Sequence, residues 1–371
     1  MCGKSARWEN GCTPSALPPT RLRIGIVGLG FGERVLLPAF RAAARCEVVG
    51  VCASSWEHAR RVAYRFGIPT AYRDWEALVD DPGVDAVVIA TPPAHHCAVA
   101  TAAFARTKHV FCEKPLADSV EAAGVMAEAA VKAGTAHMVD FEFPDMAVWR
   151  EARNILASGT LGRLRHVRVS WFGETYSNRL GLQSWKTSVA AGGGVINDFV
   201  SHCFYYLEWL LGPIRRIWAA PPPEQERERQ TDTLAVLCLE LHDGTVASIS
   251  VHTAAFLGDG HSITIHGEEG TLVLVNRRSD TAGRFELLTG TRQTGRLDRI
   301  LIDDPADEGG DYRIAAIGRL IDRFVDWAQA RGPSRPNFED GLRVQNLLDT
   351  AWRSRREGAW CAVAPLDVAA R

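Results

Sequence analysis

The feature that most constrains the fold of this chain is an alternation of short apolar runs with helical stretches through its first part. The apolar runs, which are rich in Val and Ile, lie at residues 22–28, 46–52, 84–90, 109–113 and 136–141. Between them the sequence predicts helices over residues 34–45, 56–66, 95–106 and 119–133. Such alternation is typical of an α/β fold with a doubly wound parallel sheet, whose ligands bind at the carboxyl ends of the strands.

The first apolar run leads directly into the turn Gly28-Leu29-Gly30-Phe31-Gly32-Glu33. Glycines at 28 and 30 allow the backbone to approach a pyrophosphate, which then faces the N-terminus of the next helix. The usual fingerprint has a third glycine at position 33, where this chain has Glu33, and a glycine turn kept only for tight packing is the alternative. The place of this turn on the first strand favours dinucleotide binding by Gly28, Gly30, Phe31 and Gly32.

The end of the second apolar run bears on the choice of cofactor. An acidic residue there would bind the ribose hydroxyls of NAD, but this chain has Ala53-Ser54-Ser55. Hydroxyl groups, helped by His58, Arg60 and Arg61 on the next helix, can receive a 2′-phosphate that a carboxylate would repel. The alternative is that the serines only cap the helix. We favour NADP(H) over NAD(H), with Ser54 and Ser55 as cofactor-binding residues.

After residue 143 the pattern changes. A helix is predicted over 146–158, followed by strands over 163–172, 233–241, 245–253 and 262–267. Asp243-Gly244 between two of these runs indicates a hairpin. The 371 residues are enough for two domains. We therefore expect a disordered extension over 1–20, a dinucleotide-binding Rossmann domain over 21–143 and a substrate-binding α+β domain with a mainly antiparallel sheet over 144–371.

Two segments carry side chains suited to chemistry. Lys114, in Cys112-Glu113-Lys114-Pro115, follows a strand at the edge where ligands bind, and a lysine there can stabilise charge on a substrate oxygen. Asp198 and His202 are four residues apart on a predicted helix, so that the carboxylate can orient the imidazole and raise its pKa for proton transfer. The alternatives are a surface turn and a plain ion pair. Trp185 and Lys186 indicate a lined pocket nearby.

Composition and patterning exclude several classes of function. The net charge of -2 gives no cationic field, so we expect neither nucleic acid nor an anionic membrane as a partner. No run resembles a transmembrane span, and residues 1–20 do not resemble a secretory signal. The nine cysteines have no paired spacing, which is typical of a reducing cytoplasm and predicts no metal site.

Over residues 23–363 the chain resembles the Gfo/Idh/MocA (glucose–fructose oxidoreductase / inositol dehydrogenase) family of NAD(P)-dependent oxidoreductases. The resemblance rests on motifs at residues 28–40, 90–96, 112–117, 192–202 and 338–358. It implies a Rossmann domain followed by an α+β domain whose large open sheet mediates assembly, here into a homodimer or homotetramer. It also implies hydride exchange between a nicotinamide and the carbinol carbon of a sugar, a cyclitol or a related small molecule.

The resemblance also implies roles for individual residues. Lys114 matches a lysine near both nicotinamide and substrate, and Asp198 and His202 match an Asp-x-x-x-His pair whose histidine moves the proton. The segment that passes the cofactor is matched by Thr91, Pro92 and His96, with Glu113 beside Lys114. The substrate residues expected on this basis are Lys114, Glu142, Trp185, Lys186, Asp198, His202 and Tyr205.

Three departures from the family pattern matter, and the last two bear on the identity of the substrate. Besides Glu33, Tyr205 stands where an aspartate is frequent, and Phe141-Glu142-Phe143-Pro144 replaces an Asn-x-Arg-Phe stretch. An NAD-dependent hydrolase that cleaves glycosides by transient oxidation and elimination is an alternative function. A cofactor-binding regulator is a third, which the retained Lys114, Asp198 and His202 disfavour.

Overall fold

The N-terminal sheet is built from the Val- and Ile-rich runs that the sequence predicts as parallel strands. In the computed structural model its strands are β1 (Leu22–Val27), β2 (Cys46–Cys52), β3 (Thr70–Tyr72), β4 (Ala86–Ile89), β5 (His109–Cys112) and β6 (His137–Val139). All pairs are parallel and the order is β3-β2-β1-β4-β5-β6, which confirms the doubly wound prediction.

The structure describes residues 21–366 except 183–184, 189–191, 225, 227–231, 279–282 and 303–310, so the predicted extension over residues 1–20 lies outside the described residues.

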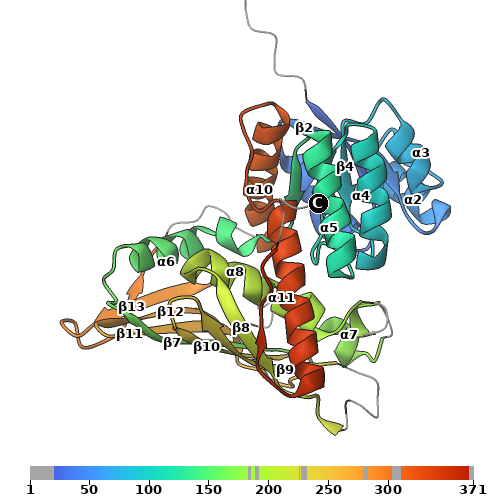
Figure 1. Ribbon diagram of the computed structural model, residues 1–371. Coiled ribbons are helices and arrows are strands. Elements are labelled where there is room, and N and C mark those ends of the chain that lie inside the picture. The colour runs from blue at the N-terminus through green and yellow to red at the C-terminus, as the bar shows by residue number, and fades with distance from the viewer. Residues whose placement is uncertain are drawn as a thin grey trace, which may run out of the picture.

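Helices cover both faces of this sheet (Figure 1). One face carries α1 (Leu37–Ala42), which follows the π-helical turn η1 (Gly32–Leu36), and α2 (Trp56–Phe66). The other face carries α3 (Trp75–Asp80), α4 (His96–Ala105), which follows the short turn η2 (Pro93–His95), and α5 (Val120–Ala133). The sequence did not predict β3 and α3, because three half-buried residues make no recognisable apolar run.

A late segment of the chain returns to the first sheet. Helix α10 (Tyr312–Ala328) packs beside α1, and its Phe324 meets Phe111 of β5 edge to face at 5.7 Å between ring centroids. Ile317, Leu320 and Ile321 of α10 belong to the same buried cluster as β1 and β2. Packing therefore places α10 with the N-terminal layer, while the predicted division between residues 143 and 144 stays a prediction.

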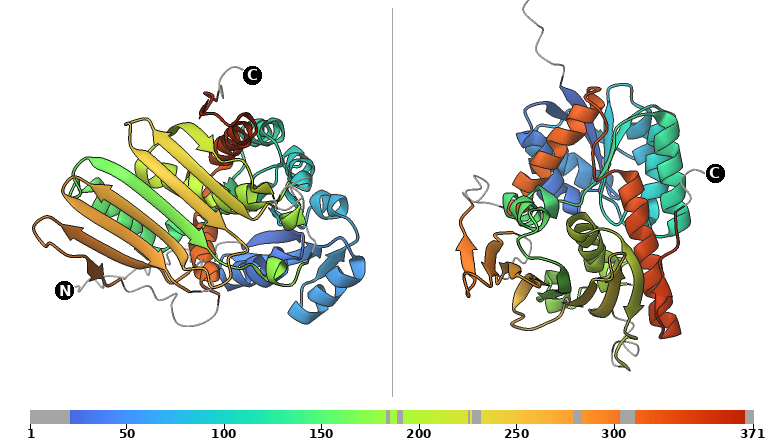
Figure 2. Two further views of the ribbon diagram at one scale, coloured as in Figure 1. Left: turned by 90° about the horizontal axis from the view of Figure 1, so that it is seen from below. Right: turned by 60° about the vertical axis from the view of Figure 1, so that its left-hand side comes forward.

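The second sheet is mixed and mainly antiparallel, as predicted. Its strands are β7 (Leu164–Phe172), β8 (Ile214–Ala219), β9 (Leu234–Leu241), β10 (Val246–His252), β11 (Gly260–Gly267), β12 (Gly270–Asn276), β13 (Glu286–Thr291), β14 (Asp298–Ile300) and β15 (Cys361–Ala362). Their order is β14-β13-β12-β11-β7-β10-β9-β8-β15, with β7 and β10 parallel. The hairpin predicted at Asp243-Gly244 joins β9 to β10. The left-hand view of Figure 2 shows the strands of this long sheet side by side, and the right-hand view shows the sheet below the N-terminal layer.

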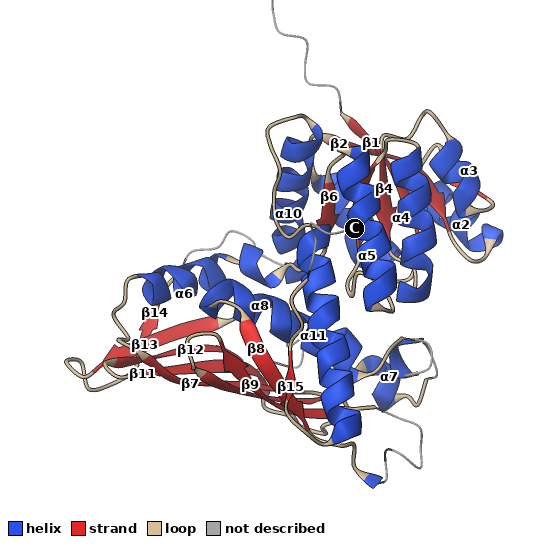
Figure 3. Cartoon of the chain, viewed as in Figure 1, coloured by secondary structure: helices blue, strands red, loops and turns tan. Residues whose placement is uncertain are grey.

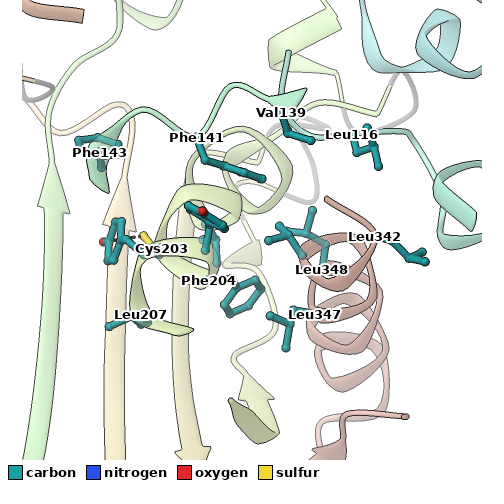
Figure 4. Close-up of a cluster of buried hydrophobic side chains, with 14 of the residues drawn as sticks. Leu116, Val139, Phe141, Phe143, Cys203, Phe204, Leu207, Leu342, Leu347 and Leu348 are labelled. Atoms are coloured by element: carbon teal, nitrogen blue, oxygen red, sulfur yellow. Dashed lines mark hydrogen bonds between the residues drawn. The ribbon is translucent and has the colours of Figure 1, made fainter. Parts of the chain in front are cut away.

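One face of this sheet carries α6 (Ala147–Ala157) and α8 (Ser201–Leu211), which follows the π-helical turn η6 (Ile196–Val200). None of the helices labelled in Figure 3 covers the opposite face. Helix α11 (Phe338–Glu357) runs beside both layers and packs on α5, β8 and α8. Between α8 and α11 lies an apolar core that also receives Phe141 and Phe143 from the loop after β6 (Figure 4). This core fixes α8 against the carboxyl edge of the first sheet. No helix within the described residues is long and apolar enough to cross a membrane.

Candidate active site

A cleft of about 1230 Å³ lies at the carboxyl ends of β1, β2, β4, β5 and β6, where the sequence places the ligand. Its far wall comes from the second sheet, from η6 and α8, and from the start of α10. The predicted residues that line it are Gly28, Gly30, Phe31, Ser54, Thr91, Pro92, Glu113, Lys114, Glu142, Trp185, Lys186, Asp198 and His202. Trp185 and Lys186 lie in the 3₁₀ turn η4 (Trp185–Thr187).

The glycine turn after β1 leaves room for a ligand backbone. Gly28 has φ +99°, and a Cβ there would lie 2.5 Å from the backbone of Ala90. A Cβ at Gly30 would meet no protein atom within 4 Å, so this part of the turn stays open. Gly32 does not line the cleft; a Cβ there would lie 3.2 Å from Cβ of Ala90, so Gly32 supplies the close helix–strand packing expected of the third glycine. The turn therefore fits a dinucleotide.

Glu33, which replaces the usual third glycine, faces away from this packing contact. Its Oε2 lies 2.8 Å from Nε2 of His58, and its Oε1 accepts a hydrogen bond from Arg65 at 2.5 Å. The departure from the fingerprint therefore costs no space at the turn, because Gly32 has taken the packing position. It adds a carboxylate that holds His58 at the edge of the cleft.

The two serines after β2 have different places. Ser54 lines the cleft, whereas Ser55 is the N-cap of α2 and accepts a hydrogen bond from the backbone N–H of His58. Of the basic residues, His58 lines the cleft and Arg60 lies over the ring of Trp56 at 4.7 Å. The same end of the cleft is also lined by Arg73, Asp74 and Trp75, which were not predicted because they follow the unpredicted strand β3.

His96 lies behind the loop after β4 and does not line the cleft. It is fully buried, with Nε2 2.8 Å from the carbonyl oxygen of Thr91 and Nδ1 3.1 Å from that of Leu116. Burial lowers its pKa. His96 therefore joins the loops that carry Thr91 and Lys114, and supports the cofactor site from behind.

Lys114 and Asp198 meet across the cleft. Nζ of Lys114 donates to Oδ1 and to the backbone carbonyl of Asp198, both at 2.7 Å, and Nζ of Lys186 lies 3.5 Å from Oδ2. Burial disfavours the charge on Lys114, but the neighbouring Asp198 outweighs it and raises the lysine pKa. Burial likewise acts against the charge on Asp198, and the two lysines outweigh it and lower the carboxyl pKa. Both groups are therefore charged at neutral pH.

His202 differs from the expectation in its electrostatics. Burial and the charge of Lys114 lower its pKa well below the ordinary value, and the opposite effect of Asp198 does not overcome them. The expected rise in pKa is absent because burial of the ring and the charge of Lys114 outweigh the effect of Asp198. The nearest carboxylate contact of the ring is instead Glu142, whose Oε2 lies 3.7 Å from Nδ1 of His202. The imidazole is neutral at neutral pH.

Three carboxyl groups of the cleft wall lie near Lys114. Burial raises the pKa of Glu113, of Asp140 and of Glu142, the last to about 7. Repulsion between Glu113 and Asp140 raises the Asp140 pKa further. Asp140 was not predicted as a site residue, because in the sequence it is only a polar residue at the end of an apolar run.

Tyr205 lies outside the cleft. Its ring stacks on Phe141 at 4.4 Å between centroids, inside the core shared by α8 and α11. Other side chains that were not expected also line the cleft: Trp171, Tyr176, Phe199, His252 and Arg313. Within the described parts of the chain, no group of three or more His, Cys, Asp or Glu side chains can hold a metal ion.

Comparisons with known proteins agree with this architecture. Residues 22–141 match the model of an oxidoreductase family with an NAD-binding Rossmann fold, and residues 149–273 match that of the GFO/IDH/MocA C-terminal domain. Levoglucosan dehydrogenase of Pseudarthrobacter phenanthrenivorans is 26% identical over 93% of this chain and 99% of its own length. The D-xylose 1-dehydrogenase (NADP(+)) 2 of Haloferax volcanii is 25% identical over 91% of this chain and 98% of its own.

A solved structure of levoglucosan dehydrogenase in complex with NADH and levoglucosan superposes with a TM-score of 0.83, at 25% identity, over 93% of this chain and 100% of that one. Both halves of the chain and their relative arrangement are thus shared with known dehydrogenases. The protein belongs to the Gfo/Idh/MocA family and is a pyridine-nucleotide-dependent oxidoreductase that acts on CH–OH groups.

Proposed function

We propose that this enzyme transfers a hydride between a nicotinamide and a secondary alcohol or ketone of a sugar, a cyclitol or a related small molecule. One observation carries the proposal: Lys114, from the N-terminal sheet, and His202, from α8, line the same cleft as the open glycine turn. The nicotinamide, when bound, supplies the hydride acceptor or donor. The chain itself must then hold the substrate and move one proton.

The residues divide this work between them. The ammonium of Lys114, fixed by Asp198, donates a hydrogen bond to the reactive oxygen and stabilises its developing negative charge. His202 is neutral and therefore takes the hydroxyl proton when the alcohol is oxidised, and returns a proton when the ketone is reduced. The aromatic side chains of Trp171, Tyr176 and Trp185 shape the part of the cleft beyond these two groups.

The substrate class is supported by the relatives, which include levoglucosan dehydrogenase, myo-inositol 2-dehydrogenase of Thermotoga maritima and D-xylose 1-dehydrogenase. The test is a panel of sugars, anhydrosugars and inositols with the purified enzyme, read by nicotinamide absorbance. Stoichiometric turnover of free cofactor with one of these compounds is expected. A tightly bound cofactor that is not consumed while a glycoside is cleaved would instead establish the hydrolase alternative.

Within this function we propose NADP(H) as the preferred cofactor. Ser54, His58 and Arg73 line the cleft at the end of β2, and residues 53–55 contain no carboxylate there. Asp74, which also lines this end, accepts the hydrogen bond of the Ala77 backbone N–H as the N-cap of α3. Ser54, His58 and Arg73 supply the hydroxyl and basic groups that suit a 2′-phosphate.

Fluorescence titration with NADPH and NADH tests this preference. Ser54→Asp is expected to weaken NADPH binding by at least about tenfold, the equivalent of roughly 1.4 kcal/mol, without weakening NADH binding. Ser55→Asp is the matched control, because an aspartate keeps the N-cap and lies outside the cleft. Tighter binding of NADH by the unchanged enzyme would contradict the proposal.

We also propose a homodimer or homotetramer that uses the face of the second sheet without helices. Val236 and Val246 are exposed on the adjacent strands β9 and β10. Exposed apolar side chains on a sheet face favour association with another subunit. Sedimentation that finds only a 40.6 kDa species at micromolar concentration would contradict this. A cytoplasmic location stays a prediction from the cysteine content.

A further inference from the structure

The buried Nδ1 nitrogen of the His202 ring faces the carboxyl group of Glu142. Nδ1 of His202 is buried without a hydrogen-bond partner among the described residues, and Oε2 of Glu142 lies 3.7 Å from it. The side chains of Glu142 and His202 are 9% and 8% exposed, so water does not readily replace this contact. A distance of 3.7 Å is longer than a hydrogen bond, but contacts of this kind often tighten when the substrate binds.

The tautomer of His202 follows from the proton that it must accept. A neutral imidazole can take a proton from substrate only through its unprotonated nitrogen, and the other nitrogen then carries the hydrogen. Because Nδ1 is buried while the residue lines the cleft, Nε2 is the nitrogen available to substrate. The N–H at Nδ1 then needs an acceptor, since a buried donor without an acceptor is destabilising.

Asp198, the acceptor that the sequence indicates, is already engaged. One of its carboxylate oxygens accepts from Lys114 at 2.7 Å, and the other faces Lys186 at 3.5 Å. Among the ion pairs of the described residues, Glu142 has no lysine or arginine partner, and its contact is with His202. Its position is fixed by its neighbours Phe141 and Phe143, which are both anchored in the core between the β6 loop and α8 (Figure 4).

We propose that Glu142 orients His202 and accepts its Nδ1 proton during alcohol oxidation, so that the proton path runs from substrate through His202 to Glu142. As the hydride leaves the carbinol carbon for the nicotinamide, the hydroxyl proton passes to Nε2 of His202 and the Nδ1 proton passes to a carboxylate oxygen of Glu142. Reduction runs these transfers in reverse. Lys114 and Asp198 remain charged and only polarise the reactive oxygen. This inference rests on the proposed function.

The charged surroundings of both groups set the pH at which this path operates. Glu142 faces His202 and feels the charges of Lys114, Arg313 and Glu113, while Asp140 lies beside Glu113. His202 is surrounded by Lys114, Lys186, Asp198 and His261. Burial, as the largest influence, raises the pKa of Glu142 to about 7. The carboxyl group can therefore both take and release a proton near neutral pH.

The first test needs no cofactor and no substrate. Infrared difference spectra of the apoprotein between pH 5 and pH 9 should contain a protonated-carboxyl band that disappears with a midpoint near 7. We expect Glu142→Gln to remove this band and Asp140→Asn and Asp198→Asn to keep it. Nitrogen NMR of ¹⁵N-histidine protein should show the proton of His202 on Nδ1. A spectrum with the band intact in Glu142→Gln, or with the proton on Nε2, would overturn the inference even if no substrate were known.

The second test uses the rate of hydride transfer in a single turnover. With Glu142 present, oxidation should speed up as the pH rises through the Glu142 pKa. Glu142→Gln should slow it by roughly 10²-fold or more, the range expected for a lost proton acceptor. It should also abolish this pH dependence, while Asp198→Asn should keep the pH dependence despite a lower rate. Glu128→Gln, on the exposed side of α5, is the control for loss of a carboxylate elsewhere.

The two hypotheses fail in different ways. A pH dependence that persists in Glu142→Gln, or is lost in Asp198→Asn, would overturn the relay and leave the dehydrogenase assignment intact. Absence of hydride transfer with every polyol tested would overturn the proposed function, while the infrared and NMR results would still decide the relay. Folding of each variant is checked first by its thermal unfolding.

Discussion

Lys114 and Asp198, which are 84 residues apart in the sequence, form a buried ion pair in which Nζ of the lysine donates to both Oδ1 and the backbone carbonyl of the aspartate. The side chains are 12% and 9% exposed. This contact joins the carboxyl edge of the first sheet to the start of the helix that carries His202. The same ion pair thus fixes the relative position of the two halves and keeps the ammonium charged for work on the substrate oxygen.

Removing one partner of this ion pair should lower the free energy of unfolding. Asp198→Asn leaves the buried ammonium of Lys114 without its counter-charge, and we expect a loss of about 3–5 kcal/mol in the free energy of unfolding. Urea unfolding measures it. The double variant Lys114→Met/Asp198→Asn should lose clearly less than the sum of the single losses, because no buried charge is then left unpaired. Additive losses would mean that the two groups do not interact.

The two glycines of the dinucleotide turn should respond differently to the same substitution. Gly28→Ala places a Cβ against the backbone of Ala90 at a φ of +99°, so it should destabilise the fold by more than about 1 kcal/mol. Gly30→Ala adds a methyl group that meets no protein atom, so stability should change by less than about 0.5 kcal/mol. Its methyl group occupies the space of the ligand, and binding of NADPH should weaken at least about tenfold. Unchanged NADPH binding by Gly30→Ala would place the pyrophosphate elsewhere.

Glu142 should make the protein less stable as the pH rises through neutrality. Its folded pKa of about 7 lies above the ordinary value of 4.5 because the group is buried. Below the ordinary value the carboxyl is protonated in both folded and unfolded chains. Between the two values the unfolded chain releases the proton while the folded chain keeps it, so the stabilising effect of that proton is lost as pH rises through the folded pKa. Glu142→Gln should therefore raise stability by on the order of 2 kcal/mol at pH 8 and much less at pH 4.

Thermal unfolding of both proteins across this pH range checks the Glu142 prediction. The difference between variant and unchanged enzyme should grow from pH 4 to pH 8. A constant difference would show that the effect comes from packing and not from the proton.

A second buried ion pair should support the site from behind. Nη1 of Arg355, in α11, donates to Oδ1 of Asp232 at 2.5 Å, and both side chains are almost fully buried. The carbonyl of Asp232 accepts from the backbone N–H of Val195, just before η6. Arg355→Leu should cost about 3–5 kcal/mol, because it leaves a buried carboxylate unpaired. Arg356→Leu, at an exposed position of the same helix, should change stability by less than about 0.5 kcal/mol, and equal losses in urea unfolding would refute the role of the pair.

The sequence by itself determined the parallel sheet, the hairpin at Asp243-Gly244 and the place of the ligand at the carboxyl ends of the strands. These features depend on local patterns, since apolar runs bury strands and glycine permits tight turns wherever they occur. For these features, the pattern of residues close together in the chain is sufficient. That Lys114 and His202 serve one site was implied by the resemblance to the Gfo/Idh/MocA family and not by any local spacing.

Only the tertiary structure decided which neighbour each polar group has. Asp198 and His202 share a helix, yet Asp198 pairs with lysines and the ring faces Glu142. Tyr205, three residues after His202, turns into the core because α8 packs on the loop after β6. The pKa values depend on burial and on charges brought in from other segments, so they follow from packing over distances that no local spacing encodes.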